Sequence, residues 1–292
     1  MASWYDESLF VCGPQPEVKQ ESGFPFRGVS RVYKRKLIAS SFVRKSKLIV
    51  GLDLVADMSS KDQAVLRQKK EQLEKDALHM VSETAQHAVA FKINRQLILP
   101  LGLFDGIPRV VDKIHDEGAT VIADCKLNDI GNTNQTIARY YLDAGFDALI
   151  VNPFVGVEGG LDSTLEMTRN RKRGIITLCY MSHPGAKDGY GLYAANEPKG
   201  KKLEPLYLQF ARKARMWGVD GVIVGATQPE KITEIREVLS EEVPILCPGV
   251  GAQGGSAREA MDAGADFIIA ARSIIESADP ASAAASLSAE TQ

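Results

Sequence analysis

The chain has 292 residues, 45% of them hydrophobic and 25% charged, a balance that is typical of globular proteins and excludes disordered and fibrous classes. Its longest uninterrupted apolar stretch, 97–104, is far shorter than the roughly 18 residues of a membrane-spanning helix. The first 13 residues lack the cationic start and apolar core of a secretory signal. These features predict a cytoplasmic protein with no membrane partner.

Charge is distributed unevenly, although the net charge is only −2. Residues 1–47 hold nine Lys and Arg against four Asp and Glu, whereas the remainder holds 26 against 33, so a basic segment precedes an acidic body. Nucleic-acid contact by this segment is the less favoured interpretation. We expect instead an amphipathic helix that packs its apolar side on the body and leaves its basic side in water. The basic residues are Arg31, Lys34, Arg35, Lys36, Arg44, Lys45 and Lys47, and the apolar ones are Val32, Leu37, Ile38, Phe42 and Val43.

Cysteine and histidine spacing predicts neither a disulfide framework nor a metal centre. No CxxC pair and no HExxH pattern occurs, so we expect reduced thiols and no metal-ligand set. The residues concerned are Cys12, Cys125, Cys179, Cys247, His79, His87, His115 and His183.

From residue 47 onward, short Val- and Ile-rich runs alternate with stretches of helical period. This pattern is typical of parallel strands covered by helices, and eight such units over about 240 residues predict a single (β/α)8 TIM barrel over 47–292. Residues 1–46 would form a helical or irregular extension. An open doubly wound sheet is the alternative, but the first βα turn, 51–54, lacks a GxGxxG fingerprint. The expected strands are 48–52, 88–93, 120–123, 148–151, 174–178, 221–224, 244–247 and 267–270.

The helices are expected at 105–116, 134–144, 160–168, 205–217, 229–239, 256–263 and 280–288, in addition to a first crossover helix. That first helix follows Ser60 and Gln63, which have the spacing of a capping box. The long glycine-containing connection 182–204, after the fifth strand, has the character of a lid or binding loop.

Polar residues close several of the apolar runs, and barrel active sites are built at these strand ends. Asp124 and Lys126 are two residues apart and should point the same way, close to Lys92 of the preceding strand. Asp129 comes three residues later, in the loop after the same strand, and we expect it to join this charged cluster. Asp53 and Ser182 follow other strands. Structural ion pairs would produce the same spacing for any single residue, but a set at three consecutive strand ends favours a reactive charged cluster.

A second candidate site lies in the glycine-rich run 248–255, which follows the seventh strand and leads into a helix. Glycines allow backbone N–H groups to approach an anion, and a helix N-terminus adds favourable partial charge. Arg272 follows the eighth strand and brings a guanidinium beside the same loop. Because barrels commonly bind phosphate between loops seven and eight, this region predicts a phosphate site.

Together these motifs resemble the orotidine 5′-monophosphate decarboxylases, in particular the archaeal and bacterial type. The resemblance covers 48 to the end of the chain. The matching segments are Asp124-x-Lys126-x-x-Asp129-Ile130-Gly131-Asn132-Thr133, Met181-Ser182-His183-Pro184-Gly185-Ala186 and the run 248–255.

The resemblance implies loss of CO2 from orotidine 5′-monophosphate to give uridine 5′-monophosphate, the last step of de novo synthesis of that nucleotide, without a cofactor or metal. It also implies a homodimer. The implied catalytic residues are Lys92, Asp124, Lys126 and Asp129; Asp53 joins Lys92 at the ribose; Ser182 and Pro184 contact the pyrimidine; Val250, Gly251, Gln253, Ala271 and Arg272 surround the phosphate; and Asp129, Ile130 and Thr133 enter the partner's site.

This chain departs from the family pattern in two respects, and two other functions are alternatives to this interpretation. The family usually has Gly where this chain has Ala271, and the segments 152–154 and 187–202 look more like another branch. One rival is a metal-dependent sugar-phosphate lyase, of the keto-gulonate phosphate decarboxylase or hexulose phosphate synthase type; these relatives have an acid where this chain has Lys92. The other rival is a non-catalytic barrel that binds a phospho-ligand or RNA, for which clustered charges would be a costly feature.

Overall fold

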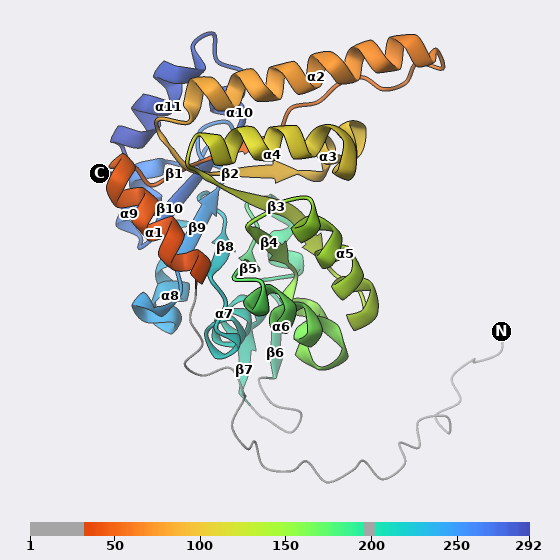
Figure 1. The fold of residues 1–292 in the computed structure, drawn as a ribbon. Coiled ribbons are helices and arrows are strands. Elements are labelled where there is room, and N and C mark those ends of the chain that lie inside the picture. The colour runs from red at the N-terminus through yellow and green to blue at the C-terminus, as the bar shows by residue number, and fades with distance from the viewer. Residues whose placement is uncertain (1–31, 196–201) are drawn as a thin grey trace, which may run out of the picture.

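A computed structural model describes residues 32–195 and 202–292. Eight parallel strands close into a barrel in the order β1-β10-β9-β8-β5-β4-β3-β2, which confirms the predicted TIM barrel (Figure 1). The pairing of Leu48 with Ile268 closes the ring between the first and last strands. The strands are β1 Leu48–Leu52, β2 Ala88–Asn94, β3 Thr120–Leu127, β4 Ala148–Val151, β5 Gly174–Tyr180, β8 Gly221–Val224, β9 Ile245–Pro248 and β10 Phe267–Ala270.

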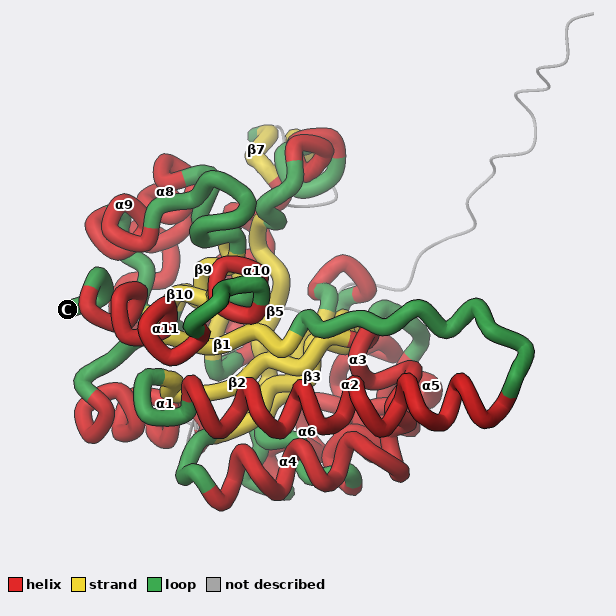
Figure 2. The backbone as a smooth tube through the Cα atoms, turned by 90° about the horizontal axis from the view of Figure 1, so that it is seen from above, coloured by secondary structure: helices red, strands yellow, loops and turns green. Residues whose placement is uncertain are grey.

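Helices surround the barrel, and the strands lie inside them in a view from above (Figure 2). The helices are α1 Val32–Arg44, α2 Gln63–Thr84, α3 Arg95–Leu101, α4 Ile107–Asp116, α5 Gly131–Asp143, α6 Asp162–Asn170, α7 Leu206–Trp217, α8 Pro229–Leu239, α9 Ala257–Asp262, α10 Arg272–Ile275 and α11 Pro280–Ala289. Gly218 ends α7 in the left-handed conformation, with φ of 63°, as the Trp217-Gly218 pair predicts. Of these helices, none is long and apolar enough to cross a membrane, a finding that applies to the described residues.

The strands are mainly apolar because both faces are covered, and the charged residues of β2 and β3 lie toward their carboxyl ends. One face packs on the helices, and the other fills the barrel interior with side chains from successive strands. The buried interior residues are Ile49, Val89, Ala90, Ile122, Ala148, Ile150, Ile176, Leu178, Ile223, Leu246, Phe267 and Ile269, joined by Tyr33 and Leu37 from α1. The interior is therefore a packed core, and only its carboxyl end is left for a ligand.

Helix α1 lies against the opposite end of the barrel, where the strands begin (Figure 1). Tyr33 is 1% exposed and packs on Gly174, where a Cβ would lie 2.6 Å from the ring. The basic side chains are less free than we expected, since Lys34 donates to the carbonyls of Glu241 and Glu242 at 3.0 and 2.8 Å. Helix α1 is thus held to the barrel by both its apolar and its basic residues.

The expected apolar face of this segment is wrong at two positions. Leu37 is fully buried, but Phe42 and Val43 are 78% and 84% exposed, because they lie on the outer side of α1. Arg31 and Cys12 lie outside the described residues. Cys125, Cys179 and Cys247 are free and buried.

The start of α2, the presence of α3 and the structure of the connection after β5 differ from the sequence predictions. Asp62, and not Ser60, caps α2, since its carboxylate accepts from Ala64 N at 2.8 Å. Helix α3 was not expected, because Pro100 lies inside it; a π-helical turn, Gly102–Gly106, then joins α3 to α4. The connection after β5 contains a short 3-10 helix, Pro184–Asp188, and an antiparallel pair, β6 Tyr193–Ala195 and β7 Leu203–Pro205.

Candidate active site

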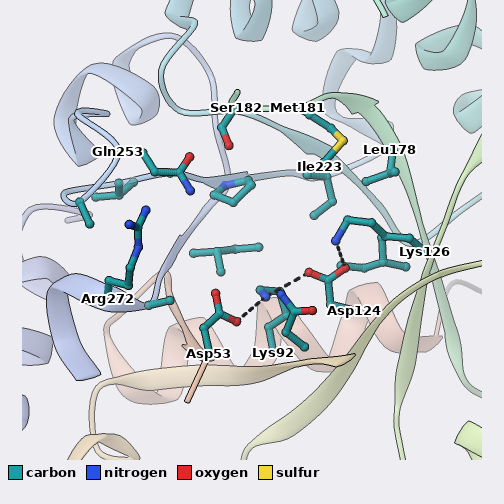
Figure 3. A pocket seen from close by; sticks show the side chains of 18 residues that line it. Asp53, Lys92, Asp124, Lys126, Leu178, Met181, Ser182, Ile223, Gln253 and Arg272 are labelled. Carbon is teal, nitrogen blue, oxygen red and sulfur yellow. Dashed lines mark hydrogen bonds and ion pairs between the residues drawn. The ribbon is translucent and has the colours of Figure 1, made fainter. Parts of the chain in front are cut away.

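A cavity of about 200 Å³ opens at the carboxyl ends of the barrel strands. Figure 3 shows that its polar side chains form two groups. Asp53, Lys92, Asp124 and Lys126 lie along one side, and Gln253 and Arg272 lie across the cavity from Lys126. The predicted residues that line the cavity are Asp53, Lys92, Asp124, Lys126, Ser182, Val250, Gln253, Ala271 and Arg272.

The first group is a chain of alternating charges. Lys92 Nζ lies 3.2 Å from Asp53 Oδ1 and 3.1 Å from Asp124 Oδ2, and Lys126 Nζ lies 2.5 Å from Asp124 Oδ1. Only 7% of the Lys92 side chain and 8% of the Asp124 side chain are exposed. The four groups therefore hold one another in place, and the two central ones, Lys92 and Asp124, are largely shielded from water.

Mutual attraction keeps Lys92 and Asp124 ionised despite their burial. Burial by itself favours the neutral form of Lys92, but Asp124 and Asp53 outweigh it, so the pKa of Lys92 is raised. Burial by itself raises the pKa of Asp124, but the ammonium groups of Lys92 and Lys126 outweigh burial and hold this pKa below its usual value. At neutral pH the cavity wall thus presents the Lys92 ammonium and the Asp124 carboxylate as a charged pair.

The backbone is strained at Lys126. Its φ is +45°, in the left-handed region that a non-glycine residue adopts at some cost, and the β3–β4 register shifts between Ala123 and Leu127. Despite this irregularity of β3, the side chains of Lys126 and Asp124 meet as the sequence spacing predicts. Strain of this kind persists only where the surrounding structure enforces it.

The second group surrounds the glycine-rich loop after β9. Gly249 and Gly251 have φ of 96° and 73°, and the loop closes on itself through a 2.9 Å hydrogen bond from Gly251 N to Gly255 O. A Cβ at Gly255 would lie 2.7 Å from Gly249 O, so only glycine fits there. The resulting turn leaves Val250, Ala252 and Gln253 on the cavity wall.

Arg272 is exposed at the start of α10, directly beside this loop. Ser273 follows it, and its Oγ is buried without a hydrogen-bond partner among the described residues. A Cβ at Gly251 would lie 2.9 Å from Ser273 Cβ, so the two loops are in close contact. A guanidinium beside a glycine-rich turn forms a favourable environment for a phosphate group.

The loop after β5 covers the cavity from a third side, with Met181 and Ser182 on its wall (Figure 3). Ser182 O accepts from Thr227 Oγ1 at 3.0 Å, and a Cβ at Gly225 would lie 2.6 Å from Ser182 Cα. The loops after β5 and β8 therefore pack closely and fix the position of the Ser182 backbone.

Several predicted residues do not line this cavity. Pro184 is exposed in the 3-10 helix, and Gly251 supports the loop from behind. Asp129 and Ile130 are exposed, and Ile130 is 69% accessible. They lie with Thr133 at the start of α5, outside the cavity lining of their own chain.

Asn94 is the polar lining residue that the sequence reasoning missed. It lies two residues after Lys92 on β2, and the period of two that placed Asp124 with Lys126 would have placed Asn94 on the same face. Met181, Pro248, Gly249 and Ala252 line the cavity from segments that the sequence singled out, whereas the lining residues outside those segments are Ile150, Leu178, Ile223 and Ile269. These are mainly apolar side chains, which a sequence does not distinguish from core residues.

A family model described as orotidine 5′-phosphate decarboxylase / HUMPS family matches residues 46–287. The chain belongs to this family. It is 40% identical over 208 residues to the orotidine 5′-phosphate decarboxylase of Pyrococcus abyssi, a match that covers 71% of this chain and 89% of that protein.

Two solved structures extend the comparison. The orotidine 5′-monophosphate decarboxylase of Methanocaldococcus jannaschii, complexed with the inhibitor BMP, has a TM-score of 0.68 and 26% identity, covering 85% of this chain and 99% of that one. The orotidine 5′-phosphate decarboxylase of Pyrococcus horikoshii has a TM-score of 0.63 and 34% identity, covering 84% and 98%. The fold and the family thus agree with the resemblance that the motifs indicated.

Proposed function

We propose that this enzyme decarboxylates orotidine 5′-monophosphate to uridine 5′-monophosphate and CO2. The observation that carries the proposal is the buried array Asp53-Lys92-Asp124-Lys126, which lies across a cavity from a candidate phosphate site. The relatives named for this activity support it.

Binding begins at the phosphate. Arg272 and Gln253, which line the cavity beside the glycine-rich loop, would hold it, and Gln253 would also reach the base. Asp53 would accept a hydrogen bond from a ribose hydroxyl, and Lys92 would donate one. Ser182 would contact the pyrimidine. Phosphate binding far from the reacting carbon then supplies binding energy that orients the orotate ring against Lys126.

The chemistry is heterolysis of the bond between C6 and its carboxylate. CO2 leaves, and the electron pair of that bond stays on C6 as a carbanion. Lys126 stabilises this charge and donates a proton from Nζ to C6, giving the product; the neutral amine then regains a proton from water. Asp124 keeps the Lys126 ammonium at this position through their ion pair.

The proposed assembly is a homodimer in which Asp129, Ile130 and Thr133 enter the partner's site. Its support is that Asp129 and Ile130 face outward from their own cavity. Apolar side chains also lie exposed on neighbouring elements, including Phe104 at 63%, whose ring packs edge-on against Tyr140 of α5. Exposed apolar surface of this kind is typical of an interface. A cytoplasmic location stays a prediction.

Neither rival has a comparable observation in its favour. The family model also covers HUMPS proteins, but in this chain the Lys92 ammonium lies between the carboxylates of Asp53 and Asp124, where a metal-dependent enzyme needs an acid. The RNA-binding alternative relied on a free basic arm, yet Arg44 donates to the backbone carbonyls of Ala85 and Glu117.

The test follows the loss of the orotate chromophore with purified enzyme. We expect turnover that EDTA does not reduce, and near-complete loss in Lys126→Ala. Lys75→Ala removes an exposed lysine from α2 and serves as the matched control. A metal requirement, or turnover of a sugar phosphate alone, would overturn the proposal.

Shared sites are tested by mixing two inactive variants. A dimer of Asp129→Ala with Lys126→Ala holds one site with both lesions and one intact site, so random mixing should restore about a quarter of wild-type activity. No recovery, with mixed dimers shown by mass spectrometry, would place Asp129 in its own subunit's site.

A further inference from the structure

The buried side chain of Asn134 lies directly behind the loop that carries Asp129. Asn134 is on the first turn of α5 and is fully buried. Its Oδ1 accepts from Asp129 N at 3.1 Å, and its Nδ2 donates to Asp129 O and, at 3.0 Å, to Gly160 O. One amide group therefore satisfies both backbone groups of Asp129 and links that loop to the loop after β4.

The same contacts restrict the Asp129 side chain. Its Oδ1 accepts from Ile130 N at 2.7 Å, and Ile130 O accepts from Asn134 N at 2.9 Å. Backbone and carboxylate are thus held as one unit at the start of α5. The carboxylate stays on the outside of the chain, away from its own cavity.

The loop after β4 provides a firm support for this unit. A Cβ at Gly131 would lie 3.0 Å from Gly159 O, and a Cβ at Gly160 would lie 2.7 Å from Val155 O. The two loops therefore pack backbone against backbone, and Asn134 bridges them from the inside. A buried, fully paired amide is costly to leave half satisfied, so such a bridge defines one loop position.

We propose that Asn134 is a positioning residue that sets the Asp129 carboxylate for the reaction. This inference rests on the proposed function, because it takes Asp129 as a member of the catalytic set. Asn134 touches no substrate; it acts through the backbone of Asp129. Loss of its amide would free the loop and displace the carboxylate, and a displacement of about 1 Å can reduce the rate by about a hundredfold.

Three variants separate its hydrogen bonds. Asn134→Ala removes all of them. Asn134→Asp keeps the size and an acceptor for Asp129 N, but it lacks the donor for Asp129 O and Gly160 O. Gln135→Ala removes an exposed carboxamide from the next position of α5 and is the control. We expect kcat/KM to fall most in the alanine variant, less in the aspartate variant, and to stay unchanged in the control.

The decisive measurement is a double-mutant cycle with Asp129→Ala. If Asn134 acts through Asp129, adding Asn134→Ala to Asp129→Ala lowers kcat/KM no further. Independent, multiplied losses would overturn the proposal, because they would mean a separate or general structural role. This result does not depend on which subunit receives Asp129.

Mixed dimers give a second readout that a merely structural role would not produce. With Asp129 acting in the partner's site, Asn134→Ala mixed with Lys126→Ala should regain activity, and Asn134→Ala mixed with Asp129→Ala should not. The opposite pattern would place the effect of Asn134 in its own subunit's site and overturn the proposal. The pair Lys126→Ala and Asp129→Ala, run in parallel, reports separately on the shared site.

Hydrogen exchange tests the positioning without any enzymatic assay. In Asn134→Ala, amide exchange should rise in the segment 128–134 and stay unchanged in the barrel strands. Unchanged exchange in that segment would contradict the proposal. If the wild-type chain fails to decarboxylate the nucleotide, the proposed function fails, while this measurement still decides whether Asn134 holds the loop.

Discussion

Gly51 on β1 offers a test of packing beside the phosphate site. A Cβ at this position would lie 2.9 Å from Ala271 Cβ and 3.5 Å from Ala270 O. Carbon atoms prefer separations of about 3.5–4.0 Å, so Gly51→Ala forces two methyl groups into one space. The strands cannot simply separate, because Val50 and Ala270 are register partners in the closed barrel. We expect the free energy of unfolding to fall by about 1–3 kcal/mol.

The partner change should relieve the clash. Ala271 has φ of −127°, so its backbone does not require glycine, and Ala271→Gly alone should cost at most about 1 kcal/mol. In the double variant Gly51→Ala/Ala271→Gly, the single methyl group moves to the other side of the contact. The double variant should therefore be more stable than the sum of the single effects predicts, by about 1–2 kcal/mol. Gly51 thus provides the space beside β1 that the Ala271 methyl group occupies.

Urea unfolding followed by circular dichroism measures the cycle, and steady-state kinetics accompanies it. Because Ala271 directly precedes Arg272, Gly51→Ala should raise KM more than it lowers kcat. Gly189→Ala is the stability control, since its Cβ would meet no atom within 4 Å and its φ is −121°. Additive single effects, or a Gly51→Ala protein as stable as wild type, would refute the packing argument.

Three further predictions concern stability and reactivity. Tyr33→Ala should lower the free energy of unfolding by about 3–5 kcal/mol, whereas Phe42→Ala on the outer side of α1 should change it by less than about 0.5 kcal/mol; equal effects in urea unfolding would contradict the packing of α1. Burial by itself raises the pKa of Asp147, but the hydrogen bond to His115 at 2.8 Å and the other partners outweigh burial and hold the pKa below its usual value. The stabilisation by Asp147 is therefore present above pH about 4 and is lost as the pH falls through the folded-state pKa. Asp147→Asn should weaken the fall in the free energy of unfolding at acid pH, and an unchanged pH dependence between pH 3 and 7 would disprove this. Burial raises the pKa of Cys125 to about 12, so the folded enzyme should resist alkylation there by iodoacetamide at pH 8, and rapid labelling seen by mass spectrometry would count against a closed β3–α5 layer.

The barrel was predictable because its signal is repeated along the chain. Each strand is an apolar run of a few residues followed by a helical period, and a local error in one unit does not change the count. The charged residues of the site were found for a related reason. Lys92, Asp124 and Lys126 stand out as polar residues within or after apolar strands, and the barrel brings all strand ends together.

Contacts between distant segments set the features that the sequence did not reveal. The strained backbone at Lys126 depends on how β3 pairs with β4 beyond Ala123, and no local pattern encodes that irregularity. Pro100 is tolerated within α3 although its ring removes a helical donor. Asp62 rather than Ser60 caps α2, because a shift of two residues decides which side-chain oxygen reaches the free amides.

The distribution of charge takes on a specific meaning in this fold. The basic surplus near the N-terminus belongs partly to α1, at the end of the barrel opposite the cavity, where Lys34 and Arg44 donate to backbone carbonyls. The charged array is itself balanced, with two carboxylates against two ammonium groups. An anionic nucleotide therefore gains little from the acidic body or from the array as a whole. Its affinity has to come from the groups at the far side of the cavity, chiefly Arg272, Gln253 and the glycine-rich loop, and this leaves the array free to act on the carboxylate that is lost.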